Sequence, residues 1–441
     1  MGDSIVRRFL MLVTAGICTY VSGPEADTLI TADNPHINYY GRFDFTNAMA
    51  PRFNWSGTTI EIKVNNATTV GVELIDGAGY FDIEIDGKIQ TTPLFADSYT
   101  SKKYTLTSSL TSAPHVIRIV RRNEPYWVIA TFKGFYLSDG AETQQLDKPV
   151  RKMEFCGDSW TAGYFIESCA DQQMHTNVNK TWARLTSKAF KAQDVILAES
   201  GIGLLKSLGG KTPLPQKYLA ALDTMGGAAS PVWDFASWIP DIVSIFLGIN
   251  DKSSGATDNE YSEAVHSFVT TLRSNYPSTP ILFISYGGCM DNATKAAVAA
   301  ETTSLNHKNV YYMECKQQVK GCSWHPDTND SRAISDSVIV KIKEILGWDT
   351  TLTTAVTVPH RSNALSSHIT ASQINNRTIR ITCATQKSHT KLTITNAAGT
   401  LIQTLQNNNN GEYLWDIGNV SNGVYFVNSE GTGRTRVVVR R

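Results

Sequence analysis

The sequence predicts a multidomain protein in which a central α/β/α domain with a parallel sheet stands between two all-β domains. Three successive patterns along the 441 residues indicate this. Short segments with alternating apolar residues fill 27–145, strands alternate with amphipathic helices over 150–347, and alternating segments return over 369–441. A chain of this length is too long for one hydrophobic core, so we expect separate domains.

The first 26 residues have the order of a secretory signal peptide. Arg7 and Arg8 precede an apolar run over 9–21, and small and polar residues follow. This run is too short to span a bilayer comfortably, so a cleaved signal is expected, with a buried first helix as the alternative. We therefore expect a protein that is secreted or attached to the cell surface, with no stable membrane span.

The first all-β domain, 27–145, is predicted from four segments that place apolar residues at alternate positions. Asp86-Gly87 forms a tight turn after one of them, and this spacing favours a sandwich of jelly-roll type. The four segments are Thr59–Val64, Val70–Leu74, Tyr80–Ile85 and His115–Val120. Four aromatic residues here are candidates for stacking on sugar rings, although packing is their commoner role: Tyr39, Tyr40, Trp55 and Trp127.

The central domain, 150–347, is predicted from strands and helices that alternate. Several strand candidates are continuous apolar runs, as expected for parallel strands that are covered on both faces. They are Met153–Phe155, Val195–Ala198, Ile242–Leu247, Ile281–Ile284 and Val310–Met313. The segments between them carry apolar residues at helical spacing, which predicts helices on both faces of the sheet.

Three helices of this domain can be predicted from their apolar stripes. Thr257 and Glu260 form a capping box at the start of the second, and the third is expected over 332–346. The stripes are Trp182, Leu185, Ala189 and Phe190, then Tyr261, Val265, Phe268 and Leu272, and last Ile334, Val338, Ile342 and Ile345.

The second all-β domain follows a Thr- and Ser-rich linker over 348–368. Its alternating segments predict a small immunoglobulin-like sandwich, with Asn407–Asn410 as a low-complexity loop. The segments are Ile379–Cys383, Lys391–Thr395, Leu401–Leu405, Val424–Val427 and Arg436–Val439.

Composition limits the classes of partner. Lys plus Arg and Asp plus Glu number 40 each, so no net field attracts nucleic acid, and a neutral substrate is favoured.

Cys315 and Cys322 flank a short loop before His325, so they either form a disulfide or remain buried thiols. No Cys/His set has zinc-ligand spacing, and we expect neither a metal nor another cofactor.

The candidate catalytic residues lie just beyond successive predicted strands. Ser159 follows Gly157-Asp158, where a strand ends and a hydroxyl can be exposed as a nucleophile. Gly201 and Asn250 can supply an amide from the backbone and one from a side chain to an oxyanion, and His325 can act as base. Each residue alone could simply belong to a turn, a helix cap or a loop, but their succession favours a hydrolytic site. Asp158 is expected to be a structural hydrogen-bond acceptor.

Over about 150–347 the chain resembles the SGNH (GDSL-type) hydrolases, whose block residues are matched by Ser159, Gly201, Asn250 and His325. With the β domain in front, including Gly41-Arg42 and the Asn54-Trp55-Ser56-Gly57 region, it resembles carbohydrate esterase family 2. Members of that family remove acetyl groups from xylan and other plant polysaccharides. The resemblance implies an acetylated polysaccharide or oligosaccharide as substrate.

The resemblance also implies a role for each block residue. Ser159 would be the nucleophile and His325 the base, and the oxyanion hole would use the amides of Ser159 and Gly201 and the side chain of Asn250. Trp324 and Trp160 would contact substrate.

One departure from the family pattern concerns the residue that orients the histidine. SGNH enzymes usually carry an aspartate two or three residues before it, and those positions are Ser323 and Cys322 here. The sequence therefore looks like the variant with a Ser-His dyad, in which a backbone carbonyl holds the imidazole. Asp327 or Glu314 could supply the missing carboxylate instead.

The end of the chain, with Asn422-Gly423-Val424-Tyr425-Phe426-Val427 and Arg440-Arg441, resembles the sorting domain of the type IX secretion system of Bacteroidota. This implies that the secretion machinery is a partner, and the alternative is an appended glycan-binding module. Two other functions stay open for the whole chain: an SGNH lipase or thioesterase acting on other acyl esters, and a non-catalytic surface glycan-binding protein.

Overall fold

The computed structural model describes residues 28–223, 229–305, 307–350 and, in the last part of the chain, 369–375, 378–383, 391–396, 400–406, 412–418, 420, 423–429 and 433–439. The expected signal peptide, most of the expected linker and the loop Asn407–Asn410 lie outside these residues. The chain divides into two compact units, one up to Leu352 and one from Thr353, and each is described by itself.

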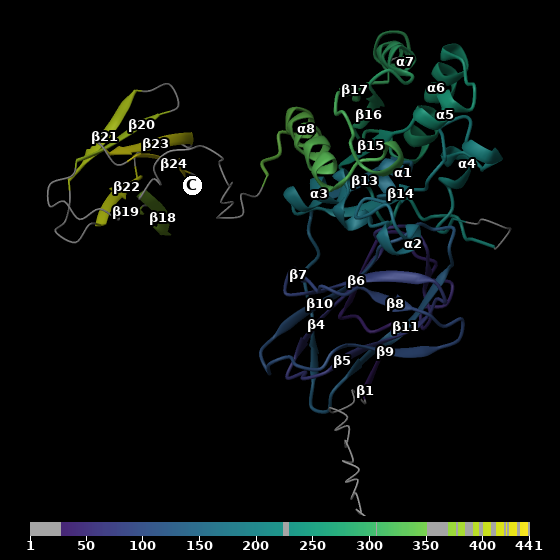
Figure 1. The fold of residues 1–441 in the computed structure, drawn as a ribbon, viewed down its shortest axis with the longest axis horizontal. Helices are drawn as coiled ribbons and strands as arrows, with labels where there is room; N and C mark the ends of the chain where they lie inside the picture. Colours follow the sequence, from purple (N-terminus) through teal and green to yellow (C-terminus); the bar gives the residue numbers. More distant parts are fainter. Residues whose placement is uncertain are drawn as a thin grey trace, which may run out of the picture. The chain divides into compact units, whose positions relative to one another are not determined.

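Two antiparallel sheets form the N-terminal part of the first unit (Figure 1). Their strands are β1 (Thr28–Thr31), β2 (Ile37–Tyr40), β3 (Arg52–Phe53), β4 (Thr59–Asn65), β5 (Val70–Ile75), β6 (Gly79–Ile85), β7 (Lys88–Ile89), β8 (Leu94–Ala96), β9 (Lys102–Thr107), β10 (His115–Arg121), β11 (Ala130–Leu137) and β12 (Glu142–Gln144). One sheet has the order β1-β11-β5-β9, with β3 paired to β11. The other has the order β12-β4-β10-β6-β7, with β2 on β4 and β8 on β6.

The core of this part consists of the alternate residues that the sequence pattern singled out. Ile60, Ile62 and Val64 of β4 are buried in one cluster with Val70 and Val72 of β5. The four predicted strands are thus confirmed as β4, β5, β6 and β10, with ends that differ by a residue or so. The jelly-roll connectivity stays a prediction.

Five parallel strands form the sheet of the central part, in the order β14-β13-β15-β16-β17. They are β13 (Lys152–Gly157), β14 (Gln193–Ala198), β15 (Ile242–Phe246), β16 (Ile281–Tyr286) and β17 (Val310–Cys315), which confirms all five predicted strands. The first strand, β13, pairs with both β14 and β15. The winding direction therefore reverses beside β13, and at such a switch point the loops at the carboxyl ends of the strands leave a crevice.

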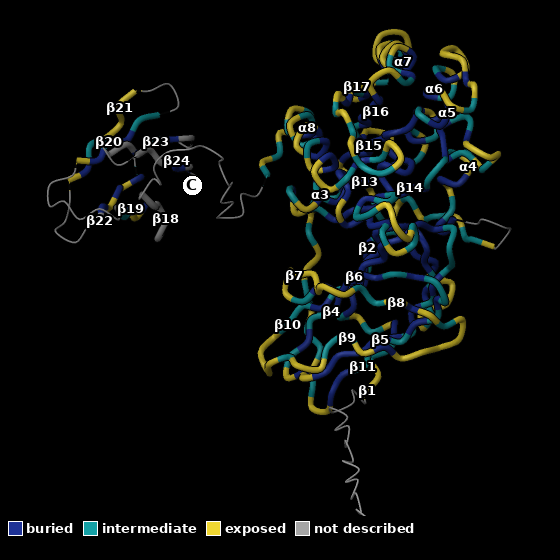
Figure 2. Tube along the Cα trace, in the orientation of Figure 1, coloured by how far each residue is buried: buried dark blue, intermediate teal, exposed yellow. Residues whose placement is uncertain are grey.

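Helices cover both faces of this sheet (Figure 1). They are α1 (Ser159–Ala162), α2 (Gln172–His175), α3 (Trp182–Ala189), α4 (Leu214–Lys217), α5 (Ile249–Ser253), α6 (Asp258–Asn275), α7 (Asp291–Thr303) and α8 (Thr328–Leu346). One apolar cluster joins the sheet to α3 and α8, and a second joins it to α6 and α7. Both faces are therefore buried, as the dark strands in Figure 2 show, and none of the helices in the described residues combines the length and apolarity needed to cross a bilayer.

Helix boundaries differ from the sequence prediction where polar caps decide them. The capping box of Thr257 and Glu260 is confirmed at the start of α6. Helix α8 begins earlier than predicted, because Asp327 and Asp330 form a second capping box. In α3 the inward face is rotated from the predicted stripe, so that Ala183 is buried.

The residues of the Gly41-Arg42 region join the β part to the hydrolase part of the first unit. Arg42 is fully buried; its Nη2 lies 3.4 Å from Glu154 Oε2 on β13, and its Nη1 donates to the carbonyl oxygens of Tyr218 and Ala220. Asn54 Nδ2 donates to the carbonyl oxygen of Asp223 over 2.7 Å. These residues therefore hold the two parts together.

Two of the aromatic residues considered for sugar binding are core residues. Trp55 is 1% exposed and packs in the cluster under the parallel sheet, and Tyr40 is buried with its hydroxyl bonded to Glu61. The sugar-stacking interpretation is therefore wrong for both. Tyr39 packs edge-on against Phe43, and Trp127 lies against Tyr126.

The second unit contains a three-stranded sheet, β18-β19-β22, and a four-stranded sheet, β21-β20-β23-β24. The strands are β18 (Ile369–Asn375), β19 (Thr378–Cys383), β20 (Leu392–Asn396), β21 (Leu401–Leu405), β22 (Glu412–Asp416), β23 (Gly423–Ser429) and β24 (Gly433–Val439). Residues of both sheets, among them Ile381, Ile394, Trp415 and Val427, share one core. The predicted β domain is confirmed, and its immunoglobulin-like connectivity stays a prediction.

We predict that Arg42→Ala lowers the free energy of unfolding of the first unit by about 3–5 kcal/mol, because Glu154 would keep a buried charge without its cation. Urea denaturation followed by tryptophan fluorescence measures this. As a control, Lys102→Ala removes an exposed ion pair to Asp97 and should cost no more than about 1 kcal/mol. A similar small cost for Arg42→Ala would contradict the prediction.

Candidate active site

Ser159 lies where β13 passes into α1. Gly157 ends the strand, and a Cβ there would lie 2.0 Å from Thr161 Oγ1, so only glycine fits. The Asp158 carboxylate then accepts from the Trp160 amide and caps α1, so Ser159 is the first residue of the helix. This tight strand-to-helix turn places the hydroxyl at the carboxyl edge of the sheet.

His325 makes one hydrogen bond with each ring nitrogen. Its Nε2 lies 2.8 Å from Ser159 Oγ, and its Nδ1 lies 2.7 Å from the carbonyl oxygen of Ser323. A carbonyl oxygen can only accept, so Nδ1 carries the proton and Nε2 is free to accept the proton of the Ser159 hydroxyl. The pair thus has the arrangement of a nucleophile and its base.

Burial lowers the pKa of His325 below its ordinary value of 6.5, and the hydrogen bonds to the Ser323 and Cys322 backbone oppose this shift only in part. The imidazole is therefore neutral at neutral pH, and this is the state in which Nε2 can take up a proton.

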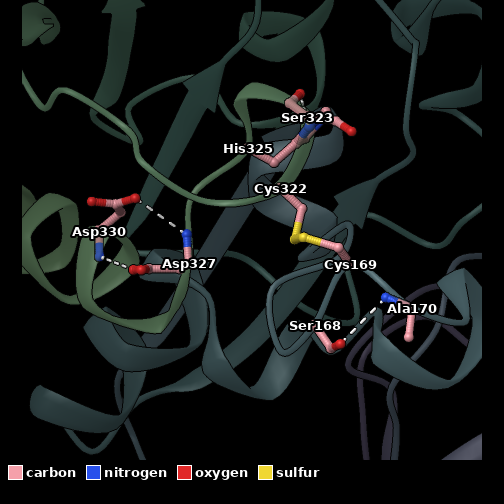
Figure 3. The surroundings of a disulfide bond; sticks show 8 residues. All are labelled: Ser168, Cys169, Ala170, Cys322, Ser323, His325, Asp327 and Asp330. Atoms are coloured by element: carbon pink, nitrogen blue, oxygen red, sulfur yellow. Dashed lines mark hydrogen bonds between the residues drawn. A yellow bond between two sulfur atoms is a disulfide. The ribbon is translucent and has the colours of Figure 1, made fainter.

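Neither carboxylate considered as an orienting group bonds to His325. Asp327 Oδ1 accepts from the amides of Asn329 and Asp330 and caps α8, as Figure 3 shows for Asp330. Glu314 lies on β17, and its half-exposed side chain faces Lys316 at 3.8 Å. The Ser323 carbonyl therefore takes the position that an aspartate holds in a triad.

A disulfide between Cys169 and Cys322 fixes the turn that precedes His325 (Figure 3). The alternative of a disulfide between Cys315 and Cys322 is wrong, because Cys315 ends β17 with its thiol buried against the sheet. Ser323 and Trp324 both have left-handed backbone angles, with φ of 50° and 64°. The disulfide ties this turn to the loop between α1 and α2.

Two residues that line the pocket, Ser159 and Gly201, have backbone amides that could serve an oxyanion. Gly201 follows β14 with a φ of 83° and lines the pocket. Among the described residues, neither the Ser159 amide nor the Gly201 amide has a hydrogen-bond acceptor. Both are therefore available to a developing oxyanion.

Asn250 lies in the pocket wall, but its amide group already has partners. Its Nδ2 donates to the carbonyl oxygen of Ile202 over 2.8 Å and to Asp158 Oδ2 over 3.3 Å. To serve an oxyanion it would give up the longer bond, to Asp158.

Asp158 makes hydrogen bonds to several elements around the site. Its carboxylate is fully buried and accepts from Tyr286 Oη over 2.6 Å. Burial raises the pKa of Asp158 to about 7, although the Tyr286 hydroxyl and the Trp160 amide stabilise the charged form. Its hydrogen bonds run to Trp160 of α1, to Tyr286 of β16 and to Asn250, and none of them runs to His325.

The pocket around Ser159 has a volume of about 460 Å³. Trp324 is 84% exposed at its rim, whereas Trp160 is 7% exposed and packs against Phe246 and Tyr286. Of the two predicted substrate-binding residues, only Trp324 thus offers a full ring face. Within the parts of the chain that the structure describes, no three His, Cys, Asp or Glu side chains gather so that they could hold a metal ion.

Three pocket residues were missed in the sequence analysis. Tyr126 comes from the β10–β11 connection and accepts a hydrogen bond from Gln172 of α2, which also lines the pocket. Tyr164 packs its ring against His325, with 4.6 Å between ring centroids. All three lie outside the four blocks, so the sequence pattern did not mark them.

We predict that Asp327→Ala and Glu314→Ala keep most of the hydrolytic activity of the site. Asp327→Ala should lower stability by about 1 kcal/mol through the lost cap of α8, without a comparable loss of kcat. Thermal unfolding together with kcat on p-nitrophenyl acetate tests this, with His325→Ala as the reference for full loss. A loss for either variant near that of His325→Ala would show that a carboxylate assists the imidazole.

Comparison with known families assigns three segments of the chain. Residues 39–146 match the carbohydrate esterase 2 N-terminal family, 155–314 match the GDSL-like lipase/acylhydrolase family, and 375–440 match the secretion system C-terminal sorting domain. The chain is 29% identical over 335 residues to cellulase/esterase CelE of Acetivibrio thermocellus, covering 72% of this chain and 40% of that one. It is also 29% identical over 336 residues to an acetylxylan esterase / glucomannan deacetylase of Cellvibrio japonicus, covering 72% and 91%.

Solved structures agree with these matches. A family two carbohydrate esterase from Clostridium thermocellum, in complex with cellohexaose, has a TM-score of 0.65 at 27% identity, covering 71% of this chain and 99% of that one. The fold also matches a family two carbohydrate esterase from Cellvibrio japonicus, with a TM-score of 0.67 at 24% identity and coverage of 73% and 98%. The chain therefore contains a carbohydrate esterase 2 N-terminal domain, a GDSL-like hydrolase domain and a C-terminal secretion sorting domain, and it is similar to family 2 carbohydrate esterases.

Proposed function

We propose that this protein is a secreted serine esterase that removes O-acetyl groups from plant cell-wall polysaccharide such as xylan or glucomannan. The observation that carries the proposal is the hydrogen bond between Ser159 Oγ and His325 Nε2 in an open pocket. Two curated relatives are named acetylxylan esterase / glucomannan deacetylase, which supports this choice of substrate.

In the proposed reaction His325 Nε2 takes the proton of Ser159 as Oγ attacks the acetyl carbonyl carbon. The negative oxygen of the tetrahedral intermediate is bound by the amides of Ser159 and Gly201, and by Asn250 once its bond to Asp158 is released. His325 then gives the proton to the leaving sugar oxygen, and the acetyl group stays on Ser159. Water activated by His325 releases acetate and restores the enzyme.

The proposed catalytic unit is a dyad whose imidazole is oriented by the Ser323 carbonyl. The carbonyl keeps the Nδ1 proton in place, so the tautomer suits proton uptake at Nε2. It stabilises the imidazolium less than a carboxylate would, because it carries only a partial charge.

The pocket suits a short acyl group on a sugar better than a long acyl chain. Leu208 and Ile249 are the aliphatic residues of its wall, and most of the others are polar or aromatic. A lipase needs an apolar channel for its acyl chain, whereas Trp324 at the rim offers a ring face to a sugar. The wall composition therefore favours the acetyl esterase over the lipase or thioesterase alternative.

The proposal also covers export and the finer description of the domains. The sorting domain indicates a secreted or surface-attached protein; we propose that the segment 1–26 is a cleaved signal peptide and that the type IX secretion machinery is a partner. We further propose domain limits of 27–145, 150–347 and 369–441, with a jelly-roll first domain and an immunoglobulin-like last domain.

We predict that the wild-type protein releases acetate from acetylated xylan or glucomannan, and that Ser159→Ala lowers the rate at least about 10³-fold. Acetate release and hydrolysis of p-nitrophenyl esters of increasing length measure this, with the acetate ester expected to be the best substrate. Ser274→Ala, on the exposed face of α6, is the matched control and should behave as wild type. Equal activity of wild type and Ser159→Ala would refute the proposal, and preference for long acyl chains would replace it with the lipase alternative.

We predict that kcat/KM falls to half of its maximum on the acid limb of its pH profile at a pH below 6.5. The reason is that the lowered pKa of His325 keeps the imidazole neutral to a lower pH. Activity is present above that pKa and falls as His325 becomes protonated below it. A pH–rate profile on p-nitrophenyl acetate measures the limb. Because Asp158 titrates near pH 7, Asp158→Asn is the control, and the limb should persist in this variant. A limb above pH 6.5 in both proteins would contradict the prediction.

A further inference from the structure

The peptide group between Ser200 and Gly201 is held by two charged side chains that belong neither to the dyad nor to the four blocks. Lys211 Nζ donates to the carbonyl oxygen of Ser200 over 2.8 Å. On the other side of Ser200, the Glu124 carboxylate accepts from the backbone amide and, over 2.7 Å, from the hydroxyl. Every polar group of Ser200 is thus bonded to one of these two residues.

The geometry of a peptide links these contacts to the oxyanion site. The Ser200 carbonyl and the Gly201 amide belong to one peptide unit, which is trans, so they point in opposite directions. A cation that holds the carbonyl therefore also fixes the direction of the Gly201 N–H. The positive charge of Lys211 also polarises the peptide and makes this N–H a stronger donor.

Glu124 comes from the N-terminal β part, in the connection between β10 and β11. Its side chain is fully buried, and burial raises its pKa to about 7, against the effect of the bonds from Ser200 and the charge of Lys211. Burying a carboxylate is costly unless it is hydrogen-bonded. The hydrogen bonds from Ser200 compensate for the burial of the Glu124 carboxylate. They also attach the β part to the loop that follows β14.

Lys211 is anchored on its other side, so its position is defined. Its Nζ lies 2.9 Å from Glu199 Oε1, and Glu199 is buried and also binds Lys217. Lys211 further lies 4.8 Å from the ring centre of Tyr126, in the pocket wall. Lys217 shares the Glu199 carboxylate and pairs with Asp223 over 3.0 Å, and it makes no contact with Ser200.

We propose that Glu124 and Lys211 are positioning residues that set the Gly201 amide for binding the oxyanion, which makes the N-terminal β part a component of the catalytic apparatus. The inference rests on the proposed esterase function and deepens it. A purely structural role would lower thermal stability alone, whereas a positioning role lowers kcat in protein that is fully folded.

The test uses the full-length chain and compares kcat and KM on p-nitrophenyl acetate, with circular dichroism and Tm as the check of folding. We expect Glu124→Ala and Lys211→Met each to lower kcat about 10- to 100-fold, less than or near the cost of losing one oxyanion donor. KM should change less than about threefold, because the amide acts mainly on the transition state. The double variant should lose little more than the worse single variant, since both act through one peptide.

Two variants serve as matched controls. Glu124→Gln should recover most of kcat, because its Oε1 can accept from the Ser200 amide while its Nε2 donates to the Ser200 hydroxyl. Lys217→Met removes the other lysine on Glu199 and should lower Tm while kcat stays within about twofold of wild type. If Glu124→Ala does not fold, Glu124→Asp decides, because it keeps the charge and withdraws the acceptor from Ser200.

The outcomes separate this inference from the proposed function. If wild type releases acetate and Ser159→Ala does not, while folded Glu124 and Lys211 variants keep kcat within twofold, the inference is overturned and the esterase proposal stands. A rise in KM at constant kcat would also overturn it and make Lys211 a substrate contact. If wild type itself has no esterase activity, the proposed function fails first.

Discussion

The hydrogen bond between Ser159 and His325 is the interaction on which the other features of the site depend. It joins side chains 166 positions apart, and the parallel sheet makes this possible. Ser159 follows the first strand, which lies between the second and the third, so the residues after β13, β14 and β15 meet at one edge. His325 reaches the same edge from the turn before α8, where the Ser323 carbonyl and the Cys322 disulfide hold it.

Charged side chains in the interior connect the β part of the first unit to this edge. Arg42 meets Glu154 on β13, and Glu124 meets Ser200 after β14. Each of these buried charges would be costly alone, so the two parts must pack together for either to be tolerated. The β part is therefore tied to the two strands, β13 and β14, that are followed by Ser159 and Gly201. Its packing bears on the site as well as on stability.

Much of this could be predicted from the sequence, because the informative patterns are local. Five buried apolar runs predicted the parallel strands, and strand ends followed by Ser159, Gly201 and Asn250 predicted where chemistry would gather. The α8 boundary was missed because Asp327, considered as an orienting acid, is instead a helix cap. The same residue type serves both roles, and only the direction of the side chain separates them.

Other features depend on distance in space and left no local trace. Cys169 lies 153 positions before its partner, so the short spacing of Cys315 and Cys322 was misleading. Glu124 lies in a different part of the chain from the loop that it holds, and its neighbours in sequence do not mark it. The bonds of Asn250 to Ile202 and Asp158 likewise depend on how loops meet at the sheet edge.

The link between Cys169 and Cys322 has a consequence for when the enzyme is complete. Such a bond forms where thiols are oxidised and not in a reducing cytoplasm. During synthesis the turn that carries His325 would thus be untethered, and the disulfide would fix it only after the chain had left the cytoplasm. Oxidation would therefore be a step of maturation that follows export from the cytoplasm.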